Sequence, residues 1–584
     1  MPRMNPMEAV VRVMEDEGVR YAFGVPGAAI LPLYEALRHS SIRHLSVRHE
    51  EGGTHAADGW ARMTGEPGVC IGTSGPAGTN MITGLYTALA DSIPMICITG
   101  QANRGVLHQE AFQAVDIVEI ARPVCKWAHQ VKETAQLPWA FREAFRVARE
   151  GRPGPVLLDL PLDVQKGPEI EYDPVIDGRL ASAVPEPSAA AIAKALELLD
   201  GAERPVILAG GGVIIADAGE ELVALAEELD VPVSPTLMGK GAIPEDHPLW
   251  AGTVGIQTSQ RHANQIFLES DVVLAVGARF GDRHTGDLDV YRGDRTFIHV
   301  DISPQQIGRV FPADLGIVSD ARLALRALRE RAAATPRRVD RGPWIQRVAH
   351  LKETLTRRTD FGDTPIKPPR VYQELNERFD RDTIFVTAIG LYQIWSGQFQ
   401  RTYRPRHYLC CGQAGPLGWE VPAAIGAKLA APEQTVVGVV GDYSFQFLME
   451  EVAVAVQYGV PFVLVMVNNG YMGLIRQAEK NYDMNFQVDL SFDGPEGHPG
   501  IDHVGIMRAM GADGVRVSEP DAIAGALDWA VAASGERRVP VLVEVMVARE
   551  DDAAMGKSID HVREFEPVTQ TLPDPVAAVP ELTG

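Results

Sequence analysis

Short apolar runs alternate with helix-period segments along almost the whole chain. Four such runs lie in the first hundred residues, at Tyr21–Val25, His44–Arg48, Val69–Gly72 and Met95–Thr99. Each is bounded by glycine-rich or polar turns, and the segments between them carry apolar residues with the period of a helix. Strands that alternate with helices form parallel sheets that are covered by helices on both faces. The pattern therefore predicts an α/β protein built of doubly wound parallel sheets.

The chain divides into three such units and a tail. A proline-rich stretch closes the first unit, which we place at residues 1–168. A second unit, 188–335, and a third unit, 366–550, are separated by an arginine-rich connector. The last stretch, 566–584, is rich in proline and has no apolar periodicity, which predicts an irregular tail. A chain of 584 residues is too long for one hydrophobic core, which agrees with this division.

Composition and charge restrict the classes of partner. A content of 46% hydrophobic and 22% charged residues is typical of globular proteins. The net charge of −23 argues against nucleic acid or an anionic membrane as a partner. No apolar run reaches the roughly 20 residues that span a bilayer, and the five cysteines lack metal-like spacing. We therefore expect a soluble, cytoplasmic protein.

Two glycine-rich loops share one spacing. The loops Gly72–Gly78 and Gly412–Gly418 both read Gly-x-x-Gly-Pro-x-Gly, and each is followed by a helical run that contains alanine. Chance recurrence of a Gly/Pro loop remains an alternative. Together with the similar strand pattern around them, the loops favour two related α/β units that flank a different middle unit.

Polar residues follow two consecutive predicted strands of the third unit. The run Val436–Val440 ends at Asp442, a helical pattern covers Gln446–Tyr458, and the next apolar run ends at Asn469. If the two strands are parallel neighbours, Asp442 and Asn469 emerge from one sheet edge roughly 5 Å apart. Their oxygen atoms suit Mg²⁺, and the helix that begins near Ser444 favours a diphosphate. Taken alone, the same residues are equally compatible with two ordinary turns.

A carboxylate in the first unit lies at a similar place. Glu50 follows a predicted strand and precedes a helix-like segment, at the edge where α/β proteins form their sites. The adjacent Glu51 is explained by the dipole of the helix that begins there. The residue types alone allow the same explanation for Glu50.

The segment around Glu50 resembles the aminopyrimidine-binding segment of thiamine diphosphate enzymes. The likeness rests on Arg-His-Glu at 48–50, on His55, and on Asp-Gly-Trp-Ala-Arg at 58–62. In that family the glutamate hydrogen-bonds N1′ of the cofactor's pyrimidine, while the cofactor carries the chemistry. The resemblance covers residues 5–560 and implies thiamine diphosphate and Mg²⁺ as cofactors.

The resemblance also implies the other residues of the cofactor site. Gly27 lies in the loop that approaches the thiazolium ring, Phe112 and Gln113 lie near its reactive face, and Leu417 takes the place of a bulky apolar wedge. Tyr471 is implied as a third residue at the metal, in addition to Asp442 and Asn469. The further implied cofactor-binding residues are Thr73, Pro76, Gly390, Leu391, Tyr392, Gly415, Gly441, Tyr443, Ser444 and Met472.

Within the family, the acetohydroxyacid synthase branch fits best, and its glyoxylate carboligases resemble this chain in their motifs. The motifs are Gly24–Ile30, Gly72–Thr79, Ala90–Pro94, Gly412–Pro422, Val467–Gln477 and Met555–Lys557. They imply a carboligase that condenses two glyoxylate molecules to tartronate semialdehyde with release of CO₂, with Leu474 and Ile475 as the apolar wall of the substrate pocket. Glyoxylate carboligases resemble one another in placing an aliphatic residue, usually valine, where this chain has Glu50. Synthesis of acetolactate from pyruvate is therefore the alternative, and a cofactor-binding homologue without turnover is a third.

The branch also implies FAD, bound in the middle unit as a structural cofactor. An acidic residue at a later strand end, such as Asp301, often holds ribose hydroxyls. The matching residues are Arg152, Gly211, Gly212, Thr236, Leu237, Met238, Arg279, Asp301, Ile302 and Asp320. In this family the pyrimidine and diphosphate ends of a site come from different subunits, so a homodimer or homotetramer is implied.

Overall fold

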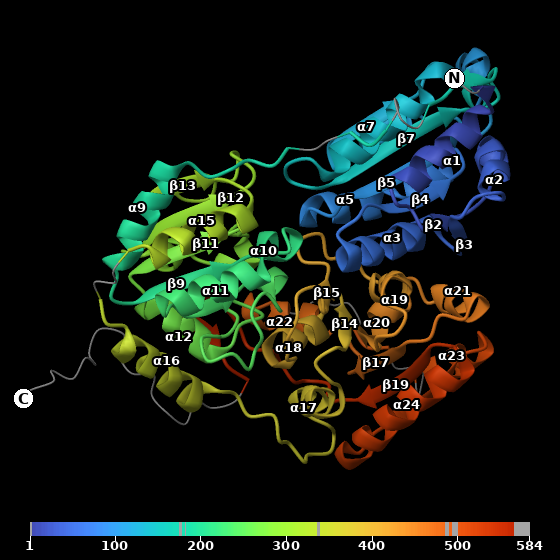
Figure 1. Cartoon of the computed structure of the whole chain (residues 1–584). Coiled ribbons are helices and arrows are strands. Elements are labelled where there is room, and N and C mark those ends of the chain that lie inside the picture. The colour runs from blue at the N-terminus through green and yellow to red at the C-terminus, as the bar shows by residue number, and fades with distance from the viewer. Residues whose placement is uncertain are drawn as a thin grey trace, which may run out of the picture.

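Three parallel sheets covered by helices make up the protein, so the predicted α/β fold with three doubly wound sheets is confirmed. The computed structural model describes residues 3–173, 178–180, 183–335, 339–484, 490–492 and 500–565. Figure 1 shows the N-terminal sheet at the upper right, the middle sheet at the left and the C-terminal sheet at the lower right. The predicted irregular tail, 566–584, lies outside the described residues.

The N-terminal sheet has the strand order β3-β2-β4-β5-β7-β6, and all adjacent strands are parallel. Val69 and Ile71 of one strand enter one hydrophobic core and Cys70 enters another, because successive side chains point to opposite faces. The strands are β2 (Tyr21–Gly24), β3 (Arg43–Ser46), β4 (Gly68–Gly72), β5 (Met95–Gln101), β6 (Trp127–Gln130) and β7 (Pro155–Pro161). The helices include α1 (Pro6–Asp16), α2 (Leu31–Leu37), α3 (Glu50–Thr64), α4 (Pro76–Asn80), α5 (Ile82–Asp91) and α7 (Leu137–Arg149).

The proline-rich stretch that marked the end of the first unit contains the inner strand β7. This strand pairs with β5 on one side and β6 on the other. Its prolines, Pro155 and Pro161, stand at its two ends, where a missing N–H group interrupts the ladder least.

The middle sheet has the order β10-β9-β11-β12-β13 and is also parallel. Its strands are β9 (Pro205–Ala209), β10 (Val233–Pro235), β11 (Val272–Val276), β12 (Thr296–Asp301) and β13 (Leu315–Val318). Its helices include α9 (Ala189–Asp200), α10 (Gly211–Ile215), α11 (Gly219–Leu229), α12 (Arg261–Glu269) and α15 (Ala321–Ala333). The arginine-rich connector contains a further helix, α16 (Gly342–Leu355), whose Trp344, Val348 and Leu351 pack with Ile266 of this unit.

The C-terminal sheet has the order β15-β14-β16-β17-β19-β18 and is parallel throughout. Its strands are β14 (Ile384–Thr387), β15 (Tyr408–Cys410), β16 (Val436–Gly441), β17 (Val463–Asn468), β18 (Asp513–Val517) and β19 (Val541–Met546). Its helices include α17 (Pro368–Arg378), α18 (Leu391–Phe399), α19 (Glu420–Ala430), α20 (Asp442–Phe445), α21 (Glu451–Tyr458), α22 (Gly473–Asn481), α23 (His503–Ala509) and α24 (Ile523–Arg537).

The two outer sheets share one topology. Counted within each unit, their strands follow the order 2-1-3-4-6-5, whereas the middle sheet has the order 2-1-3-4-5. The prediction of two related units around a different one is therefore confirmed. The glycine-rich loops are not equivalent, however, because Gly72–Gly78 follows a third strand and Gly412–Gly418 follows a second strand. Gly75 and Gly415 both have φ +61, so the shared spacing reflects one type of turn used at two places.

Helices α3 and α19 join the two outer units within the chain. A side-chain carbon at Gly59 would lie 2.2 Å from the carbonyl oxygen of Ala423, and one at Gly426 would lie 2.0 Å from that of Ala56. Only glycine allows this approach of the two backbones. Because 56 lies opposite 426 and 59 opposite 423, the helices run antiparallel, and Figure 1 shows α3 facing α19.

Candidate cofactor site

The carboxyl edge of the N-terminal sheet brings together the residues predicted for the pyrimidine end of a cofactor. A side chain at Gly27 would meet Thr73 at 2.5 Å, and one at Gly75 would meet Gln113 at 2.8 Å. Pro76 follows the same loop as the first residue of α4. These residues come from the loops after β2, β4 and β5, whose carboxyl ends lie along one edge of the parallel sheet.

Glu50 lies at this edge as the first residue of α3, and it is buried. Its Cγ atom lies 3.5 Å from the position of a side-chain carbon on Gly72. Its Oε2 atom accepts a hydrogen bond of 2.9 Å from Nδ2 of Asn80. Asn80 was not predicted, because an asparagine at the end of a helical run carries no sign of a distant partner. Glu51 is half-buried in the first turn of α3, where an acid complements the helix dipole. Its Oε1 atom lies 3.5 Å from Nε2 of His55 in the same helix.

Phe112 and Gln113 form an exposed corner of this edge. Gln113 has φ +57, a left-handed conformation that is uncommon outside glycine. The side chain of Phe112 is 87% exposed. Phe112 is therefore an exposed aromatic side chain next to Gln113, which packs against the loop at Gly75.

The C-terminal sheet brings the predicted metal residues to one edge. Strands β16 and β17 are parallel neighbours with Gly441 opposite Val467, so the predicted proximity of the segments after them is confirmed. Oδ1 of Asp442 accepts a hydrogen bond of 2.9 Å from the N–H group of Tyr443. Its Oδ2 atom is buried and has no hydrogen-bond partner among the described residues. Burial raises the pKa of Asp442 to about 6, although nearby backbone N–H groups oppose this shift.

The donor set at this edge fits a hard cation. The buried oxygen Oδ2 of Asp442 accepts no hydrogen bond from the part of the chain that the structure describes, so it is available as a ligand atom. The side chain of Asn468 already has protein partners, because its amide N–H donates to Glu544 at 2.7 Å and its Oδ1 atom accepts from the N–H group of Gly470 at 2.8 Å. Asn469, the other asparagine of the pair, is buried beside Gly473, and Tyr471 follows half-buried in the same turn. Carboxylate and carbonyl oxygens are the ligands that Mg²⁺ prefers.

The continuous helix predicted at Gln446–Tyr458 is wrong. The structure has the single turn α20, then a break, and then α21 from Glu451. The break places Phe447 and Leu448 against Gly418, where a side-chain carbon would meet Phe447 at 2.8 Å. Packing against a distant loop therefore overrides the local helical pattern.

The remaining residues predicted for the diphosphate end surround the same edge. The ring of Tyr392 fills the space beside Gly390 and Gly441, where side-chain carbons would meet it at 2.3 and 2.6 Å. A side-chain carbon at Gly473 would likewise lie 2.6 Å from the side chain of Leu391. Tyr443 stacks on Phe492, with ring centroids 5.0 Å apart. Gly415, Leu417 and Met472 are half-buried in the loops of this edge. Leu474 and Ile475 lie in the first turn of α22, where Leu474 is half-buried and Ile475 is 40% exposed.

Two buried acids at the site were missed by the sequence reasoning. Glu420 accepts a hydrogen bond from the hydroxyl group of Tyr392, and its Oε1 atom lies at hydrogen-bond distance, 3.0 Å, from Oγ of Ser444. Glu451 accepts hydrogen bonds of 2.9 and 3.0 Å from the N–H groups of Arg48 and His49, directly before Glu50. Burial raises the pKa of each acid to about 7. Both stand at the first position of a helix, where an acid is ordinarily explained by the helix dipole.

The two edges lie at opposite ends of the α3–α19 pair. Glu50 precedes Ala56 by six residues, and Glu420 precedes Gly426 by six residues on the antiparallel helix. At 1.5 Å per residue, the two acids are roughly 18 Å apart along the helix axis. Since Glu420 contacts Ser444, the diphosphate end of this chain is far from its own Glu50.

The residues predicted for FAD lie at the carboxyl edge of the middle sheet. Gly211 and Gly212 follow β9, Arg279 follows β11, and Asp301 ends β12. Arg152 of the first unit reaches this edge and donates to Ser92 at 2.7 Å. The remaining members of the set are Thr236, Leu237, Met238, Ile302 and Asp320, which follow β10, β12 and β13.

This edge fits an anionic nucleotide in part. Arg152 and Arg279 lie close enough for each to affect the electrostatics of Asp301, and such a cation pair suits a pyrophosphate. Asp320 has a structural role, because it caps α15 by accepting from the N–H group of Leu323 at 3.1 Å. Close packing accounts for Gly212, where a side-chain carbon would lie 2.7 Å from Gly277.

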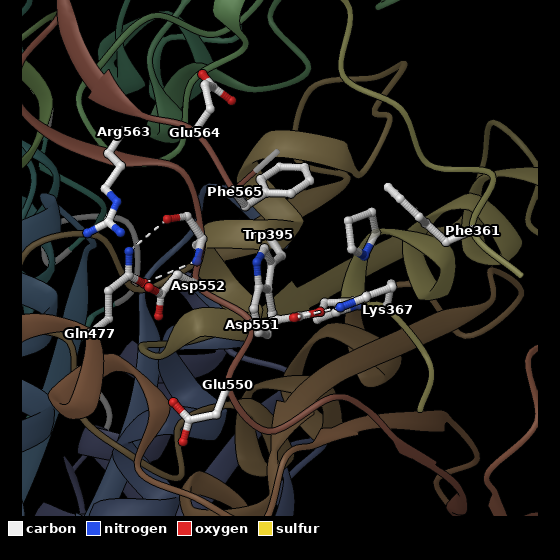
Figure 2. Close-up of a pocket in the computed structure, with 13 residues that line it drawn as sticks. Phe361, Lys367, Trp395, Gln477, Glu550, Asp551, Asp552, Arg563, Glu564 and Phe565 are labelled. Atoms are coloured by element: carbon white, nitrogen blue, oxygen red, sulfur yellow. Dashed lines mark hydrogen bonds and ion pairs between the residues drawn. The ribbon is translucent and has the colours of Figure 1, made fainter. Parts of the chain in front are cut away.

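A pocket of about 220 Å³ lies beside the C-terminal site (Figure 2). Trp395 of α18 and Gln477 of α22 line it, so it borders the helices that carry Tyr392 and Leu474. Its polar groups pair with protein, since Lys367 contacts Asp551 at 2.9 Å and Gln477 bonds both backbone groups of Ala553. We assign no ligand to it.

Across the described residues, no helix is long and apolar enough to cross a membrane.

Family models of thiamine pyrophosphate (thiamine diphosphate) enzymes match all three units. The N-terminal TPP binding domain matches residues 4–120, the central domain residues 192–328, and the C-terminal TPP binding domain residues 388–545. The chain is 50% identical to a protein named glyoxylate carboligase from Escherichia coli O157:H7, over 98% of each chain.

Other relatives are named as acetolactate synthases. A probable acetolactate synthase large subunit from Methanocaldococcus jannaschii is 40% identical over 93% of this chain and 92% of its own. An acetolactate synthase large subunit from Corynebacterium glutamicum is 38% identical over 94% of this chain and 87% of its own. The matched domains include both cofactor edges described above, so their geometry and the sequence agree. The chain belongs to the family of thiamine pyrophosphate enzymes.

Proposed function

We propose that this chain is a carboligase that condenses two molecules of glyoxylate to tartronate semialdehyde and releases CO₂. The observation that carries the proposal is the 50% identity to a glyoxylate carboligase along practically the whole chain, against 40% or less for the acetolactate synthases compared with it. The test is the rate of CO₂ release from glyoxylate and from pyruvate, with thiamine diphosphate and Mg²⁺ present. A preference for pyruvate of more than about tenfold in kcat/KM, or ~1.4 kcal/mol, would overturn it.

In this proposal each edge holds one end of the cofactor. When bound, thiamine diphosphate supplies a nucleophilic carbon and an electron sink for the loss of CO₂. Glu50 holds the pyrimidine through N1′, and Gly27 leaves room for the backbone to approach the thiazolium ring. Leu474 and Ile475 exclude water from the substrate carboxylate, which favours its loss in a site of low polarity.

Mg²⁺ and FAD belong to the same proposal. The free oxygen of Asp442, with Asn469 and Tyr471, would hold Mg²⁺ against the diphosphate. Arg152 and Arg279 would bind the pyrophosphate of FAD at the border of the first and middle units. Flavin absorbance of the purified protein, and its loss in the variant Arg279→Ala, would test the assignment of FAD.

Synthesis of acetolactate from pyruvate is the second candidate, and Glu50 is the observation that favours it. The acetolactate branch resembles this chain in carrying a carboxylate at this place, whereas glyoxylate carboligases carry an aliphatic residue. The substrate comparison above decides between the two. A protein that binds the cofactor but releases CO₂ from neither acid would be the non-catalytic homologue.

We also propose that two copies of the chain build each site. The roughly 18 Å between Glu50 and Glu420 of one chain supports this, and so does the exposure of Phe112, next to the predicted site residue Gln113. The experiment is complementation between chains that carry Glu50→Val and chains that carry Asp442→Asn, with exchange of the cofactor's C2 proton as the readout. Random pairing of two such chains restores about a quarter of the wild-type exchange if sites form between chains. No recovery would place both half-sites in one chain.

A further inference from the structure

Glu420 lies where three neighbouring strand ends of the C-terminal sheet meet. It begins α19 after β15, Tyr392 belongs to α18 after β14, and Ser444 belongs to α20 after β16. These strands are adjacent, in the order β15-β14-β16, and the chain reverses its direction of travel across the sheet at this point. Such a switch point opens a crevice at the carboxyl ends of the strands, where α/β proteins bind ligands.

The carboxyl group of Glu420 joins two of the predicted cofactor-binding residues. The Tyr392 hydroxyl donates to its Oε1 atom. Oγ of Ser444 lies 3.0 Å from Oε1 and 3.1 Å from Oε2. The same Oγ atom accepts a hydrogen bond of 2.9 Å from the N–H group of Gly418. Glu420 itself is 0% exposed.

No cation compensates Glu420 among the described residues. On the packed helix α3, Arg62 is held by Asp58 and Asp91. Burial keeps the thiol of Cys411 neutral by raising its pKa well above the ordinary value. Arg283 lies near Cys411 but donates to the carbonyl oxygen of Gly412, and no described arginine or lysine is among the groups that shift the pKa of Glu420. A buried carboxylate without a cation, next to a site for a diphosphate, is unfavourable in its charged form.

The protonation of Glu420 decides which way the hydroxyl of Ser444 points. Ser444 has one hydrogen to donate, and one of its acceptor positions is used by Gly418. If Glu420 is charged, Ser444 donates to it and has no hydrogen left for a ligand. If Glu420 is neutral, its own O–H group can donate to Oγ of Ser444 over the observed 3.1 Å, and the Ser444 hydrogen is free.

We propose that Glu420 is a positioning residue that acts as a neutral acid, donating its proton to Ser444 so that the Ser444 hydroxyl donates to the diphosphate of the cofactor. This inference rests on the proposed cofactor site. If Glu420 is charged before binding, one proton is taken up from solvent when the cofactor binds. Cofactor affinity therefore carries a component that falls as pH rises through the pKa of Glu420, which burial raises to about 7.

The test measures the dissociation constant of thiamine diphosphate with saturating Mg²⁺ by calorimetry, in the wild type and in Glu420→Gln. The glutamine amide N–H takes the place of the acid O–H, and its carbonyl still accepts from Tyr392, but it does not titrate. Dividing the two constants at each pH cancels the titration of the cofactor and of Asp442. We expect a ratio, wild type over variant, near one at about pH 6 and about tenfold at about pH 8.

Two further variants make the result specific. In a Ser444→Ala background the substitution Glu420→Gln should no longer change the pH dependence, because the hydroxyl that it orients is gone. Asp159→Asn is the matched control, since Asp159 is a buried acid of the N-terminal sheet whose pKa burial raises to about 6. It should keep the wild-type pH dependence.

The outcomes separate this inference from the proposed function. A ratio that is the same at every pH would show that Glu420 only fills space, and would overturn the inference. The same holds if Ser444→Ala leaves the effect of Glu420→Gln intact. A wild-type protein that binds no thiamine diphosphate at any pH would instead overturn the cofactor site itself.

Discussion

Replacing Glu50 by valine tests the residue on which both the cofactor assignment and the substrate assignment depend. The buried carboxylate lies at the start of α3 and accepts a hydrogen bond from Asn80. Valine removes the charge and both oxygen atoms. If Glu50 holds N1′ of the pyrimidine, the lost charge-assisted hydrogen bond is worth about 1.5–3 kcal/mol. Exchange of the C2 proton of the bound cofactor should then slow by about 10- to 150-fold.

The variant should still fold. Loss of a charge at a helix N-terminus costs about 0.3–1 kcal/mol, and the unpaired amide of Asn80 costs about 1–3 kcal/mol. The matched control is Glu51→Val, which removes the same charge from the next residue, a half-buried one. Its exchange rate should stay within about twofold of the wild type.

The assay is exchange into deuterated water, quenched with acid and read by proton magnetic resonance, beside the turnover of glyoxylate. Since glyoxylate carboligases resemble one another in having an aliphatic residue here, glyoxylate turnover should fall less than exchange does. Exchange that is unchanged in Glu50→Val would refute the contact with N1′. Equal slowing in Glu51→Val would show that the effect is a general one of charge.

The other predictions concern the metal, the helix pair and an ion pair near the C-terminus. Mg²⁺ affinity, measured by calorimetry, should fall as pH drops through about 6, because binding needs the charged form of Asp442, and Asp442→Asn should weaken it at every pH. Gly426→Ala forces a carbon to within 2.0 Å of the Ala56 carbonyl oxygen and should cost more than about 2 kcal/mol in chemical unfolding, whereas Gly525→Ala, with open space around it, should cost nothing. Two arginines lower the pKa of Glu564 to about 2, so its stabilisation is present above an unfolded pKa near 4.5 and is lost as pH falls toward 2. Glu564→Gln should therefore reduce the free energy of unfolding by about 3 kcal/mol at neutral pH, and by less as pH drops below about 4.5; an equal loss at all pH values would contradict this.

Local patterns were enough to predict that Asp442 and Asn469 follow neighbouring strands at one sheet edge. The strands before Asp442 and Asn469 are continuous apolar runs, and the right-handed crossover between them makes a parallel neighbour the expected outcome. The pairing of β16 with β17 confirms this. The helix break before Glu451 was not predictable in the same way, because it depends on packing of Phe447 against Gly418, which lies in another loop.

The sequence by itself determined the α/β class, the sheet edges and the residues that stand at them, because apolar periodicity and turn residues act over a few positions. Only the tertiary structure decided which distant residues meet. It brought Asn80 to Glu50, and it brought Glu420 to Tyr392 and Ser444. It also placed the two half-sites at opposite ends of one helix pair. An acid at a helix start looks the same in sequence whether it faces water or a buried hydroxyl, since burial depends on packing between units far apart in the chain.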